Sequence, residues 1–263
     1  MAILNVTPDS FSDGGAIESV DDALRAVEHF IDEGADIIDI GGESTRPGST
    51  RVDVETELKR TLPVVTSIAK RFDIPISIDT SKSVVATALI DSGAEIINDI
   101  SGLRWDSNVA DVSARTGAAL VLMHSRGDFE TMHSQPPADD DNINVVDGLR
   151  SSLETARSRG VRDEQIALDI GIGFGKTPEQ NLELLAKIDK IVIEFEMFPI
   201  LVGASRKSFI GKLTGEQNPV NRLAGSLAAA AIAVANGVRI VRVHDVKETR
   251  EAITVAEAIR VER

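Results

Sequence analysis

Polar side chains close several short apolar runs of this sequence. Most of these runs are rich in β-branched residues, which is the composition of a buried strand. The polar residues in question are Asn5, Asp79, Asn98, Asp169, Arg242 and His244. Two carboxylates and one amide could bind the edge of a flat heterocycle, because an ionised carboxylate accepts two parallel N–H bonds and an amide both donates and accepts. Asp79, Asn98 and Asp169 therefore predict a pocket for a small ring with a guanidine-like edge.

Cationic side chains accompany these acceptors in the last third of the chain. Ile240, Arg242 and His244 share one face of a strand with period two, and Lys207 follows an earlier apolar run. Polar or cationic groups that point into a packed core are costly unless they meet a ligand. Arg242 and Lys207 could bind a diphosphate or an electron-rich ring. Asn5 and His244 could bind a diphosphate whose oxygens are bridged by Mg²⁺, and such an ion would arrive with the substrate.

A structural interpretation competes with this one for each residue taken singly. Asp and Asn are favoured N-caps, so each could simply cap the helix after its strand. The glycine-rich stretch at residues 171–176 matches neither the P-loop nor the dinucleotide pattern, and we interpret it as a tight turn with Phe174 as an apolar wall. His124 and His133 are nine positions apart in the sequence, which disfavours a zinc pair. Taken as a set, however, the carboxylates, amides and cations favour a binding site.

Eight β-rich runs alternate with segments of helical apolar spacing, which predicts a single-domain (β/α)8 TIM barrel over residues 1–263. The predicted strands are residues 2–5, 36–40, 75–79, 95–98, 119–123, 166–169, 200–203 and 239–244. The predicted helices are residues 20–33, 54–71, 83–91, 145–159, 178–189, 222–236 and 247–260. Glycines just after several helices predict tight helix-to-strand turns. By contrast, residues 6–19, 41–53 and 124–144 form long strand-to-helix loops, so the site is expected at the C-terminal mouth of the barrel.

Composition narrows the possible partners and compartment. The chain has 263 residues, 42% of them hydrophobic, no cysteine and a formal net charge of −14. The missing cysteines exclude disulfides and thiol chemistry, and an acidic chain with 3% aromatic residues disfavours nucleic acid. No leader pattern and no apolar run of about 20 residues is visible, so we expect a cytoplasmic protein without a membrane partner. Residues 223–234 are apolar nearly all round, which a homodimer contact or a neighbouring helix would explain.

Several sequence blocks, in order, resemble those of the dihydropteroate synthase family. The most specific are ILNVTPDSFSDGG at residues 3–15 and GGESTRPG at residues 41–48. Further matching blocks are IDTSK at 78–82, IND at 97–99, LMH at 122–124, GFGK at 173–176, SRKS at 205–208 and RVHD at 242–245. The resemblance covers essentially the whole chain. It implies a barrel enzyme of folate synthesis that joins 6-hydroxymethyl-7,8-dihydropterin diphosphate to 4-aminobenzoate, releases diphosphate, uses Mg²⁺ and is inhibited by sulfonamides.

The resemblance also implies a role for each matching position. The residues implied to hold the pterin are Asp79, Asn98, Met123, Asp169, Gly203, Lys207 and Arg242. Those implied to hold the diphosphate are Asn5, Arg242 and His244, with Asn5 as the metal ligand. Those implied to shape the aminobenzoate site are Phe11, Thr45, Arg46, Pro47, Phe174 and Ser205. Asp79, Lys207, Arg242 and His244 are the implied catalytic groups, and the family suggests a homodimer.

Two departures from the family pattern and two rival functions remain. Ile170 stands where proline usually follows the aspartate, and Ala2 stands where glycine is common. One rival is a methyltetrahydrofolate:corrinoid methyltransferase, which would bind a pterin on the same barrel but would not need the Ser205–Lys207 and Arg242–His244 segments. The other is a pterin-binding relative without synthase activity. Diphosphate release that depends on 4-aminobenzoate would distinguish all three.

Overall fold

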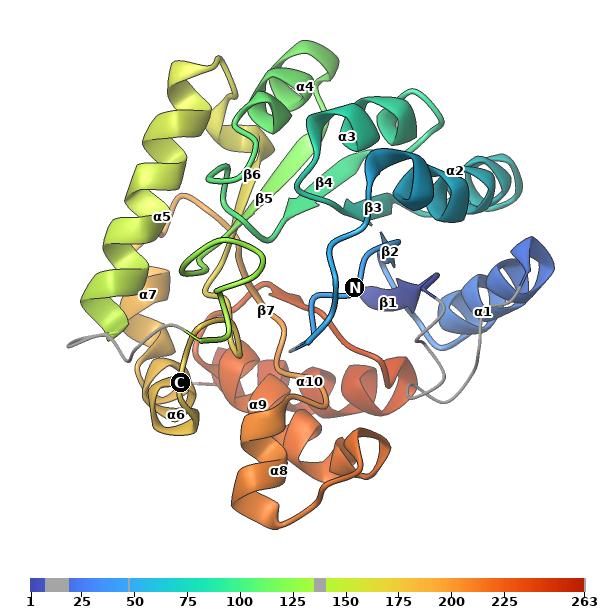
Figure 1. Ribbon diagram of the computed structural model, residues 1–263. Coiled ribbons are helices and arrows are strands. Elements are labelled where there is room, and N and C mark those ends of the chain that lie inside the picture. The colour runs from blue at the N-terminus through green and yellow to red at the C-terminus, as the bar shows by residue number, and fades with distance from the viewer. Residues whose placement is uncertain (8–18, 47, 135–140, 263) are drawn as a thin grey trace.

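The described residues fold into a closed barrel of eight parallel strands, with the helices outside (Figure 1). The computed structural model describes residues 1–7, 19–46, 48–134 and 141–262. The strands are β1 (Ala2–Asn5), β2 (Ile38–Gly41), β3 (Ile76–Asp79), β4 (Ile96–Asp99), β5 (Ala119–Met123), β6 (Ile166–Asp169), β7 (Ile200–Val202) and β8 (Ile240–Val241). They pair in sequence order, and a bridge from Ala2 to Val243 closes the ring. The predicted (β/α)8 fold is confirmed; the single-domain assignment stays a prediction.

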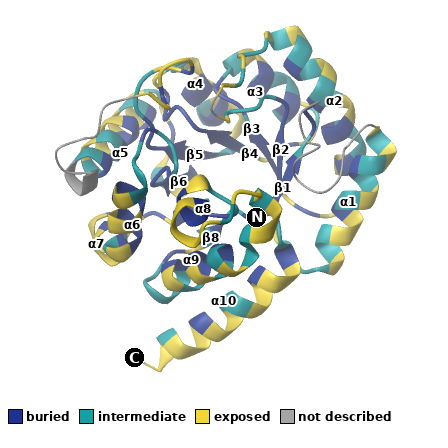
Figure 2. Cartoon of the chain, turned by 60° about the horizontal axis from the view of Figure 1, so that its bottom comes forward, coloured by how far each residue is buried: buried dark blue, intermediate teal, exposed yellow. Residues whose placement is uncertain are grey.

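The described helices alternate with the strands along the chain. They are α1 (Val20–Asp32), α2 (Val54–Arg71), α3 (Ser83–Ile90), α4 (Asn108–Thr116), α5 (Asp141–Ser158), α6 (Pro178–Ala186), α7 (Ile188–Glu194), α8 (Ser208–Thr214), α9 (Leu223–Ala235) and α10 (Val246–Val261). Short 3₁₀ turns stand before β6 and α9. The sequence prediction lacked α4 and α8, which are too short for a clear apolar period, and it merged α6 with part of α7. Figure 2 shows the strands buried at the centre and the outer helix faces exposed.

Apolar residues fill the interior of the barrel below its mouth. Met1, Val121, Ala167 and Leu201 form this inner core with Ile37, Ile96 and Ile240. The alternate strand residues, such as Ile38, Ile76 and Ile97, point outward into the larger core under the helices. A residue two positions after an inner-core residue therefore points inward at the next layer toward the mouth. This spacing decides which polar side chains line the site.

The two ends of the barrel differ as the sequence predicted. Gly34, Gly93, Gly117, Gly160 and Gly237 have positive φ after their helices, so each allows an abrupt turn into the next strand. The long loops lie at the opposite end, where α2 and α6 begin with side-chain caps from Asp53 and Thr177. None of the helices in the described part of the chain is both long and apolar enough to cross a membrane.

Candidate functional site

A buried ion cluster occupies the mouth of the barrel. The Arg242 guanidinium donates from Nε to Asp39 Oδ2 at 2.6 Å and from Nη2 to Asp79 Oδ2 at 2.9 Å. Asp39 is fully buried and also accepts from Ser77 Oγ and from Asn98 Nδ2, the latter at 3.1 Å. Side chains from β2, β3 and β4 and from the end of β8 are thus joined through one carboxylate. We call Asp39, Asp79, Asn98, Asp169, Lys207 and Arg242 the mouth cluster.

Asp39 is the member of the mouth cluster that the sequence prediction missed. It lies two residues after Ile37 of the inner core, just as Asn98 follows Ile96 and Arg242 follows Ile240. An acidic residue with that spacing in a predicted strand was the available signal. Without Asp39, the partly buried guanidinium would keep only Asp79 as a charged partner among the described ion pairs.

Strand register sets the mouth residues side by side. Asn5 pairs with Gly41, Gly41 with Asp79, and Asp79 with Asn98 across three neighbouring strand pairs. A Cβ on Gly41 would lie 3.4 Å from Asn5 Oδ1 and 3.6 Å from the Asp79 Cβ, so these two side chains flank the Gly41 backbone at the mouth. On the other side, Met123 pairs with Asp169, and both residues are buried.

One buried acceptor of the mouth cluster, the side-chain oxygen of Asn98, has no donor among the described residues. Asn98 Oδ1 has no hydrogen-bond partner among the residues that the structure describes, although its Nδ2 donates to Asp39. A buried amide oxygen without a partner costs about 1–3 kcal/mol, so such atoms call for an explanation. An N–H group of a ligand bound at the mouth would satisfy Asn98 Oδ1.

Asp169 and Lys207 form a second part of the mouth cluster. Asp169 Oδ1 accepts from the Gly171 amide at 2.7 Å, and Lys207 Nζ lies 4.0 Å from the centroid of the Phe174 ring. Gly173 has a φ of +83°, and a Cβ there would meet Lys207 Cδ at 2.8 Å. The interpretation of residues 171–176 as a tight turn with Phe174 as an apolar wall agrees with this geometry.

Burial and shared charge shift the pKa values of the mouth cluster. Burial raises the pKa of Asp79 to about 7, opposed by Arg242 and reinforced by the nearby Asp39 carboxylate. Burial raises the pKa of Asp169 and lowers the pKa of Lys207 to about 8, with Asp169 opposing the fall at Lys207. Two carboxylates share the Arg242 guanidinium, so one carboxyl of the group holds a proton more readily than a free one. These shifts mark a polar site that a ligand can complete.

The loop after β7 is fastened to the segment after β8. Ser205 Oγ and His244 Nδ1 lie 3.0 Å apart, and the His244 amide donates to Ser205 Oγ at 3.3 Å. Arg206, whose φ is +59°, donates from Nε to Asp245 Oδ2 at 3.1 Å. These contacts place Ser205 and His244, two residues that the sequence singled out, beside each other.

A loop rim lies above the mouth cluster and consists of Thr45, Arg46, His133 and Phe174. His133 Nε2 lies 2.7 Å from the Thr45 carbonyl oxygen, and its ring stacks on Phe174 with the centroids 6.0 Å apart at 29°. Three strand-to-helix loops thus meet through His133, which the sequence had considered only as a metal ligand. Phe11 and Pro47, both expected at the aminobenzoate site, lie outside the described residues.

The predicted polar residues converge on one mouth. Asp79, Asn98 and Arg242 are joined directly or through Asp39, and Lys207 interacts electrostatically with Asp79, Asp169 and Arg242. Met123 and Gly203 lie at the same ends of their strands. A Cβ on Gly203 would lie 3.8 Å from Arg242 Cβ. Within the described residues, no three His, Cys, Asp or Glu side chains are grouped to hold a metal ion.

Fold and site together define a barrel enzyme that binds a polar ring at its C-terminal mouth. This chain belongs to the pterin-binding enzyme family, whose sequence pattern matches residues 1–244. It is 48% identical over 260 residues to the dihydropteroate synthase of Escherichia coli strain K12, covering 98% of this chain and 90% of that protein. It is 43% identical over 259 residues to the dihydropteroate synthase of Synechocystis, covering 98% of this chain and 89% of that protein.

Solved structures extend the similarity to three dimensions. The chain matches the Yersinia pestis dihydropteroate synthase in complex with a sulfonamide drug, with a TM-score of 0.93, 42% identity, and coverage of 100% of this chain and 94% of that chain. It also matches the Xanthomonas albilineans dihydropteroate synthase with 4-aminobenzoic acid, with a TM-score of 0.90, 41% identity, and coverage of 99% and 92%. The resemblance seen in the sequence motifs is therefore confirmed.

Proposed function

We propose that this protein is an active dihydropteroate synthase that joins 6-hydroxymethyl-7,8-dihydropterin diphosphate to 4-aminobenzoate. The observation that carries the proposal is the mouth cluster, in which Asn98 presents an unpartnered buried acceptor beside Asp79 and Arg242 among the described residues. A pterin presents an amino-pyrimidinone edge with adjacent N–H groups. Asp169 and Asn98 accept those N–H groups, while Lys207 and Arg242 bind the ring from the other side.

The leaving group is bound by cations at one side of the mouth. Arg242 and His244 bind the diphosphate, and the Arg242 charge together with their N–H donors stabilises the anion that forms when the bond from the pterin methylene carbon to oxygen breaks. The electron pair leaves with the diphosphate, and Asp79 stabilises the positive charge that develops on the pterin. The 4-aminobenzoate nitrogen then forms the new C–N bond and loses a proton.

Mg²⁺ fits this side of the mouth. An amide oxygen is a hard donor of the kind that Mg²⁺ prefers. Asn5 would hold the ion, since its side-chain oxygen lies at the end of β1, beside Gly41 and Asp79 at the mouth. Bound there, Mg²⁺ would neutralise negative charge on the diphosphate.

The second substrate binds on the loop rim. Phe174 covers one face of the aminobenzoate ring, while Thr45, Arg46 and Ser205 bind its polar end. The resemblance implies that Phe11 and Pro47, in the two signature segments, also shape this site; both lie outside the described residues. Closure of these loops would exclude water that could otherwise capture the pterin cation.

Diphosphate release tests the proposed function directly. A coupled assay should show release that requires both 4-aminobenzoate and Mg²⁺. Tight pterin binding without turnover would instead favour an inactive relative, and methyl transfer from methyltetrahydrofolate would favour the corrinoid enzyme. Sulfonamides should compete with 4-aminobenzoate in the same assay; indifference to millimolar drug with ordinary aminobenzoate affinity would contradict that part.

We also propose a cytoplasmic homodimer formed through α9 and α10. Ile232 on α9 and Val255 and Ile259 on α10 are 51%, 60% and 54% exposed, and α9 packs against α10. A second copy would cover these apolar side chains. Sedimentation of Ile259→Lys should then show a shift toward monomer, and an unchanged dimer would argue against this face.

A further inference from the structure

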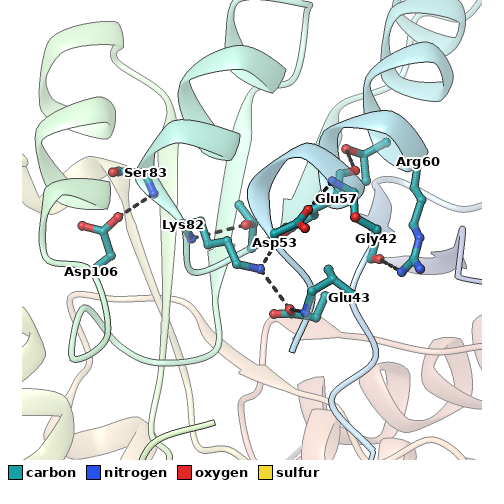
Figure 3. A network of polar contacts seen from close by, with 12 residues as sticks. Gly42, Glu43, Asp53, Glu57, Arg60, Lys82, Ser83 and Asp106 are labelled. Carbon is teal, nitrogen blue, oxygen red and sulfur yellow. Dashed lines mark hydrogen bonds and ion pairs between the residues drawn. The ribbon is translucent and has the colours of Figure 1, made fainter. Parts of the chain in front are cut away.

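A buried ion triad lies at the base of the β2–α2 loop (Figure 3). Lys82 Nζ lies 2.9 Å from Glu43 Oε1 and 2.5 Å from Glu57 Oε2. The side chains of Lys82, Glu43 and Glu57 are only 11%, 9% and 1% exposed. They come from the turn before α3, from the β2–α2 loop and from α2, so the triad connects three separate elements.

The triad holds the two ends of the β2–α2 loop together. Glu43 Oε1 accepts both from Lys82 Nζ and from the Val52 amide, the latter at 2.6 Å. One carboxylate therefore joins two residues nine positions apart in the loop and ties them to the turn before α3. Removing Lys82 would leave Glu43 without its ammonium partner at the point where the loop closes.

Two further contacts fix the start of the loop. Arg60 Nη1 donates to the Gly42 carbonyl at 2.8 Å, and a Cβ on Gly42 would collide with Thr61 Cγ2 at 2.6 Å. The backbone of Gly42 is thus held against α2. Thr45 follows three residues later, and Arg46 follows Thr45, so the position of this base sets where both side chains reach the loop rim.

Energetics favour a positioning role over a simple gain in stability. Two buried carboxylates and one ammonium carry a net negative charge, and desolvation offsets much of their attraction. Apolar side chains of similar volume would often stabilise a fold as well.

We propose that Lys82 is a positioning residue for the second substrate. Through Glu43 and Glu57, its ammonium group holds the β2–α2 loop so that Thr45 and Arg46 face 4-aminobenzoate, without touching either substrate itself. This proposal rests on the proposed synthase function. Under this proposal, Lys82 affects the binding of only one substrate. It governs the affinity for 4-aminobenzoate and leaves the affinity for the pterin close to that of the natural protein.

Steady-state kinetics with each substrate varied in turn tests the role. Lys82→Met should raise the KM for 4-aminobenzoate roughly 10-fold or more, because small misplacements of a binding loop have effects of this size. Binding of the pterin diphosphate, measured by calorimetry without 4-aminobenzoate, should change less than about 3-fold. Lys82→Arg retains the positive charge and should restore most of the loss. Lys59→Met is the matched control, since Lys59 is an exposed lysine on α2.

A second variant covers the case in which Lys82→Met does not fold. Glu43→Gln keeps a side-chain oxygen for the Val52 amide but removes the ion pair, and it should raise the same KM by roughly 3-fold. Equal losses of affinity for 4-aminobenzoate and for the pterin diphosphate would overturn the positioning role. A lowered melting temperature with both affinities unchanged would overturn it as well. The role would also be overturned if Lys82→Arg had the same raised KM for 4-aminobenzoate as Lys82→Met. An inactive natural protein would instead refute the synthase function, so the two failures are distinguishable.

Discussion

The mouth cluster and the loop rim are built in different ways. Asp39, Asn98 and Asp169 lie on strands, are at most 6% exposed, and have neighbours fixed by strand register. His133 and Arg46 lie on loops and are exposed. A ring that enters the mouth meets preorganised partners, whereas a ligand at the rim meets side chains that depend on a few loop contacts. The first substrate should therefore be selected by rigid hydrogen bonding and the second by how well the loops are placed.

The largest expected effect is loss of pterin binding in Asp169→Ala. The carboxylate accepts from Gly171 and, in the proposed complex, from paired pterin N–H groups. Losing two charge-assisted hydrogen bonds of about 1.5–3 kcal/mol each should weaken binding by roughly 10²- to 10⁴-fold. Calorimetry with the pterin measures this directly.

Asp163→Ala is the control for Asp169→Ala. Asp163 stands in the turn that precedes β6, pairs with Arg157 at the protein surface and is far more exposed than Asp169. Its removal should leave pterin affinity unchanged. An Asp169→Ala protein with natural pterin affinity would show that the rigid strand ends do not select the first substrate.

The next effect concerns the stability of the mouth cluster. Asp39→Ala removes the acceptor shared by Arg242, Ser77 and Asn98. The free energy of unfolding should fall by roughly 3–5 kcal/mol, because three donors lose their shared buried acceptor and the partly buried guanidinium keeps only Asp79. Urea denaturation measures the change.

An exposed ion pair provides the comparison for Asp39. Asp111 pairs with Arg159 at 2.7 Å on the surface, and Asp111→Ala should cost less than about 1 kcal/mol. Equal losses of unfolding free energy in Asp39→Ala and Asp111→Ala would mean that the barrel mouth is no more rigidly built than the surface.

The pH dependence of stability gives a smaller but more specific effect. Because the pKa of Asp79 is raised to about 7 in the fold, the folded protein binds this proton more tightly than the unfolded chain does. The contribution of Asp79 is therefore present at low pH and is lost as pH rises toward about 7, with a slope of at most about 1.4 kcal/mol per pH unit. Asp79→Asn should flatten this part of the profile.

Denaturation at a series of pH values between about 4.5 and 7.5 tests the effect. Burial raises the pKa of Asp99 to about 6, so Asp99 also makes the free energy of unfolding fall as pH rises. This contribution is the same in both proteins and cancels in the difference between them. Lys207, with its pKa lowered to about 8, titrates above this range. Parallel profiles for the natural protein and Asp79→Asn would mean that Asp79 is ionised throughout.

Sequence alone located the barrel and much of its mouth, for identifiable reasons. Period-two strands and glycine-ended helices report the fold because they reflect local geometry, as at Gly117, where φ is +81°. Asn98 and Asp169 were predicted because a polar residue stands out at the end of an apolar run. Asp39 was missed because it lies inside its strand, where the partners that make it tolerable, Ser77 and Arg242, are distant in sequence.

The loop rim was less accessible from the sequence. The contact between His133 and Thr45 joins residues 88 positions apart, and no periodicity links two irregular loops. Thr45 was assigned to the second substrate only through its resemblance to a family motif, whereas Phe174 was predicted as an apolar wall from the glycine-rich turn. His133 lies in none of the quoted motifs. Contacts that arise solely from how loops meet in space need coordinates.

The smallest expected effect is on the loop rim itself. His133→Ala removes one hydrogen-bond contact with the Thr45 carbonyl and the stacking on Phe174. A single neutral hydrogen bond contributes about 0.5–1.5 kcal/mol, so the KM for 4-aminobenzoate should rise roughly 2- to 10-fold while pterin affinity stays the same. His29→Ala, which removes an exposed histidine on α1, should change neither. A rise in the pterin dissociation constant with an unchanged KM for 4-aminobenzoate would contradict the assignment of the loop rim to the second substrate. It would show that the rim acts on the first substrate instead.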